Sequence, residues 1–141
     1  MALSENYKNR LKFLQSATTD LELALAEDLT QFTDRQQDIL RNGQVQKFEF
    51  CIELLWKVLK VYLYEREGVD EGTPKSVIKA YYRTGKIASS DFEELIQMIE
   101  DRNILSHLYS QIEFLEIHLR LFRHIRTIRS VVNLLIHNDR V

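Results

Sequence analysis

The side chains of this sequence that are best suited to chemistry lie together at residues 100–109. Arg102 is followed five positions later by His107 and then by Tyr109. A guanidinium group can hold a phosphate through two parallel hydrogen bonds, and an imidazole can move a proton near neutral pH. Without any metal, these two groups are sufficient for RNA cleavage in which the ribose 2′-hydroxyl attacks the adjacent phosphate.

The same residues also permit a purely structural interpretation. On a straight helix, five positions separate two side chains by about 140°. Arg102 and His107 therefore converge only through the length of the arginine, through a distortion of the helix, or through a second subunit. In the structural alternative, Arg102 pairs with Glu100, Asp101 or a neighbouring helix, and His107 is a core residue with satisfied hydrogen bonds. The pattern alone leaves both interpretations open.

The helix expected to carry this motif has an apolar stripe that turns polar near its C-terminal end. Its apolar positions recur at alternating steps of three and four, at Phe92, Leu95 and Ile99. The same steps then reach three polar positions, Arg102, Ser106 and Tyr109. Asn103 and His107 lie one turn apart beside this stripe. Because a buried arginine costs several kcal/mol unless it is paired, the polar end of the stripe suggests a cleft or an interface.

The composition is that of an ordinary globular protein. The 141 residues predict one domain, 1–141, and the 45% apolar and 28% charged residues fit a chain that buries its own core. The net charge of −2 gives no overall attraction to nucleic acid or to a membrane. The single cysteine, Cys51, excludes an internal disulfide, and no stretch approaches the ~20 apolar residues of a membrane span. We therefore expect a cytoplasmic protein without membrane association.

Helical spacing of apolar residues predicts an all-α protein. The expected helices cover about residues 5–28, 34–41, 44–67 and 75–84, then the motif helix from about residue 90, and finally 111–137. No segment shows the two-residue alternation of a strand. The expected fold is therefore an up-down bundle of four to five helices.

Several local signals set the expected helix ends. Thr33 or Asp34 can cap a short helix that Asn42-Gly43 is expected to end, and Pro74 suits the first turn of a later one. Gly85 is expected to end the helix at about residues 75–84. Ser90 and Glu93 are expected to form a capping box at the start of the motif helix. The sequence leaves open whether the motif helix bends near residue 110 before the last helix begins.

Other kinds of active site find no support. The four histidines do not repeat at ligand spacing and Cys51 stands alone, so we expect no metal site. The glycines form no phosphate-binding loop, and no nucleophile elbow is present. We expect no cofactor.

A second candidate surface is the basic C-terminal segment. Residues 118–138 contain four arginines and no acidic residue. Three of them, Arg120, Arg123 and Arg126, form a spiralling strip that can contact a phosphate backbone or an acidic partner. A solvated helix face beside the apolar stripe is an equally good interpretation. The aromatic residues are expected in the core or at its rim rather than in a base-stacking platform: Trp56, Tyr62, Tyr64, Tyr81 and Tyr82.

The spacing Arg102-x4-His107-x-Tyr109 resembles the R-x4-H-x-Y signature of HepT-type proteins. These belong to the higher-eukaryote and prokaryote nucleotide-binding (HEPN) superfamily and are also described as nucleotidyltransferase substrate-binding proteins. The run DRNILSH at 101–107 is close to the wording of that group. Further segments that resemble it follow in order: YKNRL at 7–11, QKFEF at 46–50 with ELLWK at 53–57, and PKSVI at 74–78.

This resemblance implies a helical homodimer in which two Arg–His motifs face one cleft. Such proteins are metal-independent ribonuclease toxins that leave cyclic phosphate ends. A minimal nucleotidyltransferase (MntA-like) encoded beside them neutralises them by transferring AMP to the motif tyrosine. On this chain, Arg102 would stabilise the phosphate, His107 would transfer a proton, Asn103 matches the polar residue after the arginine, and Tyr109 would accept AMP. Residues 110–114 lack the acidic run expected there, which bears on how the partner docks.

Three functions therefore compete at this point. The first is an RNase toxin of a toxin–antitoxin pair, acting on RNA and controlled by a partner enzyme. The second is a non-catalytic accessory subunit that binds a nucleotide or substrate for a two-component nucleotidyltransferase. The third is a helical interaction module in which Arg102 and His107 are structural.

Overall fold

In the computed structural model, the backbone is described for residues 2–140 and the side chains for residues 2–138. The prediction of an all-α protein is confirmed, because these residues form five α-helices and no strand. The elements in order are α1 (Glu5–Leu25), a 3₁₀ turn η1 (Leu29–Gln31), α2 (Asp34–Tyr62), a π turn η2 (Leu63–Glu67), α3 (Pro74–Arg83), α4 (Ser89–Leu105) and α5 (Gln111–Arg140).

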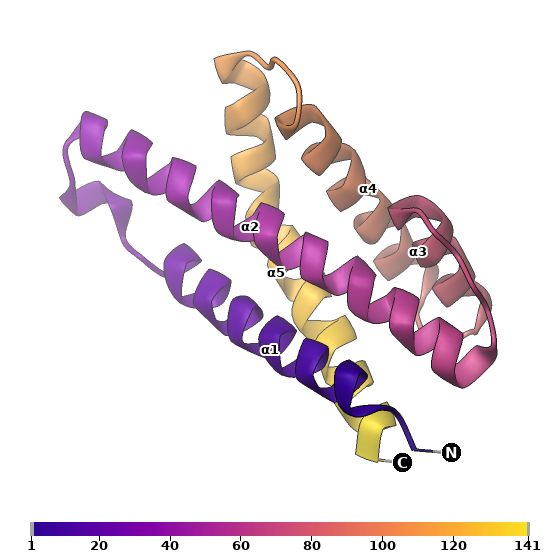
Figure 1. Ribbon diagram of the computed structural model, residues 1–141. Coiled ribbons are helices and arrows are strands. Elements are labelled where there is room, and N and C mark those ends of the chain that lie inside the picture. Colours follow the sequence, from indigo (N-terminus) through magenta and orange to yellow (C-terminus); the bar gives the residue numbers. More distant parts are fainter. Residues whose placement is uncertain (1, 141) are drawn as a thin grey trace.

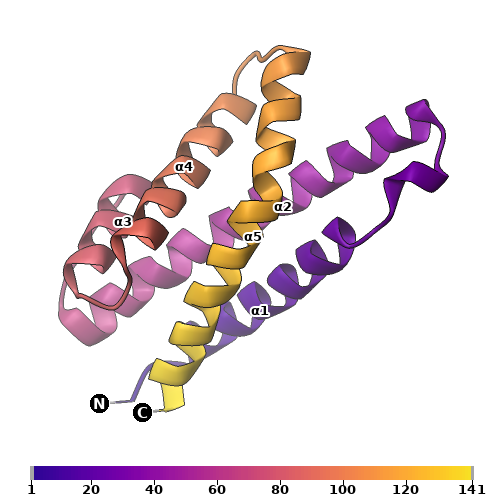
Figure 2. The same cartoon turned by 180° about the vertical axis from the view of Figure 1, so that it is seen from behind.

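The long helices α1, α2 and α5 form the body of the bundle, and the shorter α3 and α4 pack beside α2 and α5 (Figure 1). The view from behind shows α5 running along the molecule across α1 and α2 (Figure 2). The connection between α4 and α5 lies at one end, while the start of α1 and the end of α5 lie together at the other. None of the helices that the structure describes is long and apolar enough to cross a bilayer.

One continuous apolar core joins the five helices. Its largest buried side chains come from α1, α2 and α3, and include Tyr7, Leu14, Phe48, Tyr62 and Tyr81. The cap of α1 also ties distant parts of the chain together. The Ser4 hydroxyl accepts a bond from the amide of Tyr7 at 3.1 Å and donates to Glu65 of η2 at 2.6 Å. The N-terminal helix is thereby fixed to the end of the α2 segment.

The predicted break at Asn42-Gly43 is wrong, because α2 runs unbroken from Asp34 to Tyr62. The expected cap is present, since Thr33 and Gln36 form a capping box at the start of α2. A helix-interior glycine costs about 1 kcal/mol. Burial of the following turn outweighs this cost: Val45 is in the core, and the buried Gln44 donates to the Ala24 carbonyl at 2.7 Å.

The other early helices differ from prediction only at their ends. The first stops at Leu25 rather than near residue 28. The α-helical part of α2 ends at Tyr62, and the chain reaches Glu67 as a π turn that closes at Gly68 with φ of 67°. That left-handed conformation suits glycine. Pro74 begins α3 as expected, and Gly85 follows its end with φ of 79°.

Both ends of the motif helix differ from prediction. Ser90 and Glu93 do not cap it, since α4 begins at Ser89 after Ala88, which makes no side-chain cap bond. The helix also ends at Leu105, so residues 106–110 form a connection outside it. The reason is a competing cap: the Ser110 hydroxyl accepts from the Glu113 amide at 3.1 Å, and Glu113 accepts from the Ser110 amide at 3.0 Å. This capping box starts α5 and stops α4 from continuing.

Candidate functional site

Arg102 lies in the last turn of α4 and forms an ion pair with Glu53 of α2 at 2.5 Å. The partner of Arg102 is therefore on a neighbouring helix, and is neither Glu100 nor Asp101. Both side chains are about 30% exposed. An ion pair at this exposure is worth about 0–1 kcal/mol, so it orients the guanidinium group while leaving it able to exchange partners.

Glu53 is the centre of a small polar cluster on α2. Partial burial tends to raise its pKa, but hydrogen bonds from Lys57 and Trp56 and the charge of Arg102 outweigh burial and lower the pKa. The Lys57 ammonium lies 3.0 Å and the Trp56 ring nitrogen 3.1 Å from its carboxylate. One turn earlier, burial raises the pKa of Glu49, and the charge of Arg102 partly offsets this. Arg102 therefore faces two carboxyl groups of different character.

The connection between α4 and α5 lies at one end of the molecule (Figure 1). It contains His107 and Tyr109, and both are exposed. The His107 imidazole and the Tyr109 hydroxyl have no hydrogen-bond partner among the described residues. The Tyr109 ring stacks on Phe114, with centroids 6.2 Å apart and planes at 19°. Asn103 is exposed on α4, and its carbonyl accepts from the Ser106 amide at 3.2 Å. The separation of 140° no longer applies, because the helix ends before His107.

Beside Arg102 lies a buried polar network that the sequence did not reveal. The fully buried carboxylate of Asp101 accepts two bonds from Arg120 of α5 at 2.7 and 3.0 Å. It also accepts a bond from Gln97 at 2.9 Å and lies 2.7 Å from Nε2 of His124. Burial tends to raise the pKa of Asp101, but the bonds from His124, Arg120 and Gln97 outweigh it and lower the pKa.

His124 connects the two acidic residues of this network. Its ring is fully buried and stacks on Phe48, with centroids 5.3 Å apart. While Nε2 faces Asp101, Nδ1 lies 2.5 Å from Glu94, which also accepts from Arg123 at 2.7 Å. Each ring nitrogen of His124 therefore faces one carboxylate, one from Asp101 and one from Glu94. The network fastens α4 to α5 between Glu94 and Asp101, and Asp101 directly precedes Arg102 in the sequence.

The three arginines predicted to contact nucleic acid do not form one free surface. Arg120 and Arg123 bind Asp101 and Glu94, as described above. Arg126 is exposed, and its Nε donates to the Phe122 carbonyl at 3.2 Å. Contact of these residues with nucleic acid stays a prediction, and Arg120 and Arg123 would have to share or leave a carboxylate to make it.

Comparison with known proteins identifies the family. The family model described as nucleotidyltransferase substrate binding protein like matches residues 9–135. The chain belongs to this family. A solved structure from Thermus thermophilus is similar as well, with 29% sequence identity and a TM-score of 0.73, covering 85% of this chain and 96% of that one. No curated protein matches the chain. The resemblance inferred from the sequence segments is thereby confirmed for the family.

This family member exposes an apolar stripe that begins inside the motif connection. The residues follow steps of four and three along the first half of α5: Leu108, Ile112, Leu115, Leu119 and Phe122. Leu108 is fully exposed, and Ile112 and Leu119 are each 70% exposed. Such spacing is typical of a helix seam that packs against a partner helix. The stripe therefore places an apolar contact surface directly beside His107 and Tyr109.

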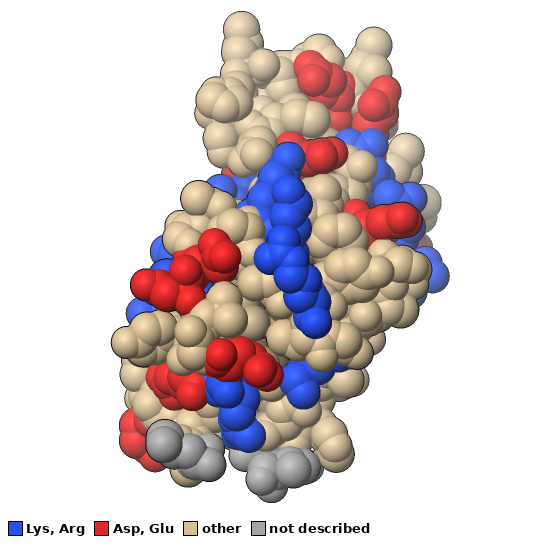
Figure 3. Space-filling model, turned by 90° about the vertical axis from the view of Figure 1, so that its right-hand side faces the viewer, with Lys and Arg blue, Asp and Glu red and all other residues tan. Residues whose placement is uncertain are grey.

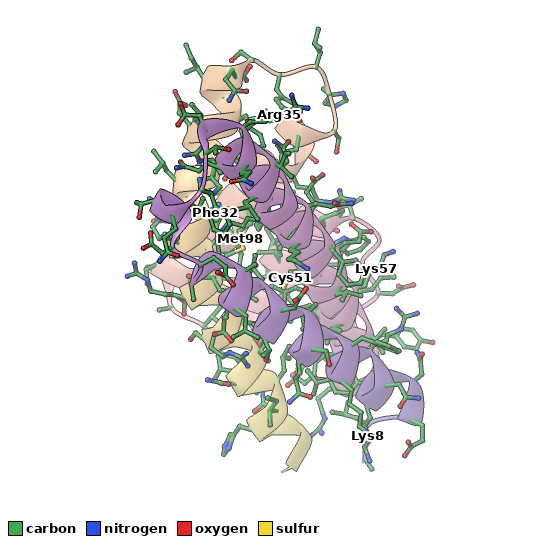
Figure 4. The ribbon with its side chains drawn as sticks, turned by 90° about the vertical axis from the view of Figure 1, so that its left-hand side faces the viewer. Lys8, Phe32, Arg35, Cys51, Lys57 and Met98 are labelled. Carbon is green, nitrogen blue, oxygen red and sulfur yellow. The ribbon has the colours of Figure 1, made fainter. Side chains whose placement is uncertain are left out.

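The remaining candidate groups lie away from the motif. Figure 4 looks onto α1 and α2, with Cys51 between them. Its sulfur lies 3.6 Å from the Thr18 hydroxyl, and burial raises the pKa of the thiol to about 11, which makes it a core residue rather than a nucleophile. An open groove of about 570 Å³ between Phe13 of α1 and Phe50 of α2 contains no motif residue. Within the described residues, no group of His, Cys, Asp and Glu side chains could hold a metal ion.

Proposed function

We propose that this protein is a metal-independent endoribonuclease whose site is built from Arg102 and His107 and is controlled by AMP transfer to Tyr109. The observation that carries the proposal is that all three side chains reach solvent at one end of the molecule, with Arg102 already oriented by Glu53. The guanidinium group of Arg102 can bind a phosphodiester through two hydrogen bonds. The imidazole of His107 makes no hydrogen bond within the described part of the chain, so it is available to a substrate.

At phosphorus, the proposed reaction forms one bond and breaks one. The ribose 2′-oxygen attacks the adjacent phosphorus and its proton passes to a base. The bond from phosphorus to the 5′-oxygen breaks, and that oxygen takes up a proton. The products are a 2′,3′-cyclic phosphate and a 5′-hydroxyl. His107 serves as one of the two proton-transfer groups, and Arg102 offsets the charge that develops on the phosphate.

A phosphate must compete with the Glu53 carboxylate for the guanidinium group of Arg102. In the free chain its carboxylate occupies Arg102, but the pair is part-exposed and weak. A phosphodiester offers two oxygens to the same guanidinium fork and can replace or share this contact. Glu53 therefore acts as a positioning residue that keeps the Arg102 guanidinium group against α2 until RNA binds.

We further propose that two copies complete the site. One copy supplies one motif histidine, whereas the reaction needs a base and an acid. The exposed apolar stripe of α5 begins at Leu108, between His107 and Tyr109. Pairing of two such stripes would bury this surface and bring the two motif connections together. This arrangement explains why large apolar side chains surround a polar motif.

Family membership supports a nucleotidyltransferase as the partner enzyme. In the proposed control step, the Tyr109 oxygen attacks the α-phosphorus of ATP, loses its proton and displaces pyrophosphate. The attached AMP would place a negative charge and a bulky base two residues from His107. RNA phosphate would then be repelled from the site.

A second candidate function follows from the family description itself. A non-catalytic subunit would bind the substrate of a separate nucleotidyltransferase, using Arg102 to hold a phosphate of that substrate. This candidate predicts tight association with the enzyme and no nuclease activity of the isolated chain.

The test is incubation of purified protein with total RNA in EDTA, after mass spectrometry has established that Tyr109 is unmodified. The His107→Ala variant is compared with His137→Ala, which removes an exposed histidine at the far end of α5. Cleavage by the parent and by His137→Ala, but not by His107→Ala, supports the ribonuclease. Absence of cleavage by folded, unmodified parent protein contradicts it and favours the accessory subunit.

A further inference from the structure

Helix α3 carries a row of basic side chains that the proposed site does not use. Residues 72–90 contain four basic residues and no acidic one, although the whole chain has a net charge of −2. Within α3, Lys75, Lys79 and Arg83 follow one another at steps of four, so they lie within about 80° of one face and span about 12 Å. All three are exposed, and Lys86 continues beyond the helix as another exposed lysine.

The charges of this row are largely uncompensated. Lys75 lies 3.6 Å from Glu100 of α4. Among the described residues, Lys79, Arg83 and Lys86 have no carboxylate within ion-pair distance. On the side of the molecule that carries α3, basic side chains form a narrow continuous band (Figure 3). The arginines of α5 differ in this respect, because Arg120 and Arg123 are bound to carboxylates.

An aromatic ring flanks the row. Tyr82 is 36% exposed, and its ring stacks on Phe92 of α4 with centroids 4.4 Å apart and planes at 13°. The sequence predicted Tyr82 in the core or at its rim, and the structure places it at the rim. Phe92 supports the ring from one side. Proteins that bind single-stranded nucleic acid combine a basic groove with aromatic rings on which bases stack.

The row also approaches the proposed site. The contact between Lys75 and Glu100 joins its first residue to α4, two positions before Arg102. Glu100 and Arg102 lie about 200° apart around α4, so a strand that follows the row toward Lys75 reaches the last turns of α4 and passes around the helix to meet the guanidinium group. At about 3.4 Å per phosphate in a stacked strand, a row of about 12 Å meets on the order of three phosphates.

We propose that the α3 row, with Tyr82 at its edge, binds the backbone of single-stranded RNA and guides it to Arg102. This inference rests on the proposed function and identifies the surface that holds its substrate. RNA is favoured over an acidic protein because protein interfaces are poor in lysine and apolar at their centre. The row is rich in lysine and has a single aromatic ring beside it.

The test measures binding separately from cleavage, on the His107→Ala protein. A fluorescein-labelled single-stranded RNA of mixed sequence is titrated, and fluorescence anisotropy gives the affinity at several salt concentrations. The row variant is Lys79→Gln with Arg83→Gln. Its matched control is Arg10→Gln with Lys12→Gln, which removes the same charge from two exposed positions on α1. Circular dichroism checks that both variants fold.

For single strands, each phosphate contact lowers the binding constant by about 0.7 logarithmic units per tenfold rise in salt concentration. Losing two contacts therefore reduces the slope of log affinity against log salt by about 1.4. The row variant is then about 25-fold weaker than its parent at 0.1 M salt and similar to it at 1 M. The control keeps the parental slope. Replacing Tyr82 with Leu weakens binding further, whereas Tyr82→Phe does not.

Equal losses in the row variant and the control, or no loss in either, overturn the proposal. Intact RNA binding with lost association to the nucleotidyltransferase also overturns it and assigns the row to an acidic protein surface. The two proposals fail separately. If RNA binding depends on the row but the parent protein cuts no RNA, the role of the row is supported and the ribonuclease is contradicted. If the parent cuts RNA and the row substitutions leave cleavage unaffected, the ribonuclease is supported and the role of the row is contradicted.

Discussion

Replacing Asp101 with Asn tests the buried network that holds α4 against α5. The substitution keeps the shape of the side chain but removes the charge that accepts bonds from Arg120 and His124. The Arg120 guanidinium and the buried His124 ring would then face a neutral amide. Breaking a buried ion pair by removing one partner costs about 3–5 kcal/mol. For a chain of 141 residues this corresponds to a fall in Tm on the order of 10–15 °C.

The loss must depend on pH in a defined direction. Because the pKa of Asp101 is lowered in the folded protein, its ionised form stabilises the fold above the ordinary pKa of 3.8. That stabilisation disappears as the pH falls through the lowered pKa of the folded state. The parent and Asp101→Asn proteins should therefore differ fully at neutral pH and converge in strong acid.

The assay is urea unfolding followed by circular dichroism, at neutral pH and at several acidic values. Glu116→Gln serves as a control that removes a carboxylate from an exposed site of the neighbouring helix. A loss below about 1 kcal/mol at neutral pH, or a difference that grows in acid, would refute the reasoning, because the network would then contribute no more than a surface pair.

Three further predictions follow from particular residues. Gly43→Ala should raise the free energy of unfolding by about 1 kcal/mol, measured by urea unfolding, because an added Cβ meets nothing within 4 Å; a loss of stability would contradict the space found there. Ser110→Ala should lower it by about 1 kcal/mol through loss of the α5 cap, with Ser130→Ala, an exposed serine within α5, as the unaffected control. Under the proposed pairing of two copies, light scattering should give a dimer for the parent and a folded monomer for Leu119→Asp, and an unchanged mass would contradict pairing through α5.

The helices were predictable because burial of one face leaves its period in the sequence. The failures have local causes that a pattern of apolar residues does not weigh. At Gly43 the glycine does disfavour a helix, but burial of the side chains in the next turn stabilises α2 enough for it to continue. At residues 106–109 the apolar steps suggested a longer helix, whereas the capping box at Ser110 started a new one.

The residues of the motif could be predicted, but their partners could not. Glu53 and Arg102 are 49 positions apart, and nothing in either segment indicates that the two helices meet. The same holds for Asp101 and His124, which look like ordinary surface residues of two amphipathic helices until packing buries both. The basic segment of α5 was visible in the sequence; that two of its arginines are held by carboxylates depends on the arrangement of α4.

The chemistry of the RNA ends is the most direct test of the central claim. Total RNA is incubated in EDTA with unmodified parent protein or with His107→Ala, and the newly formed ends are analysed. The account predicts 2′,3′-cyclic phosphate and 5′-hydroxyl ends with the parent and none above background with His107→Ala. New ends carrying a 5′-phosphate, or equal ends with both proteins, would contradict attack by the ribose 2′-hydroxyl at a site built from Arg102 and His107.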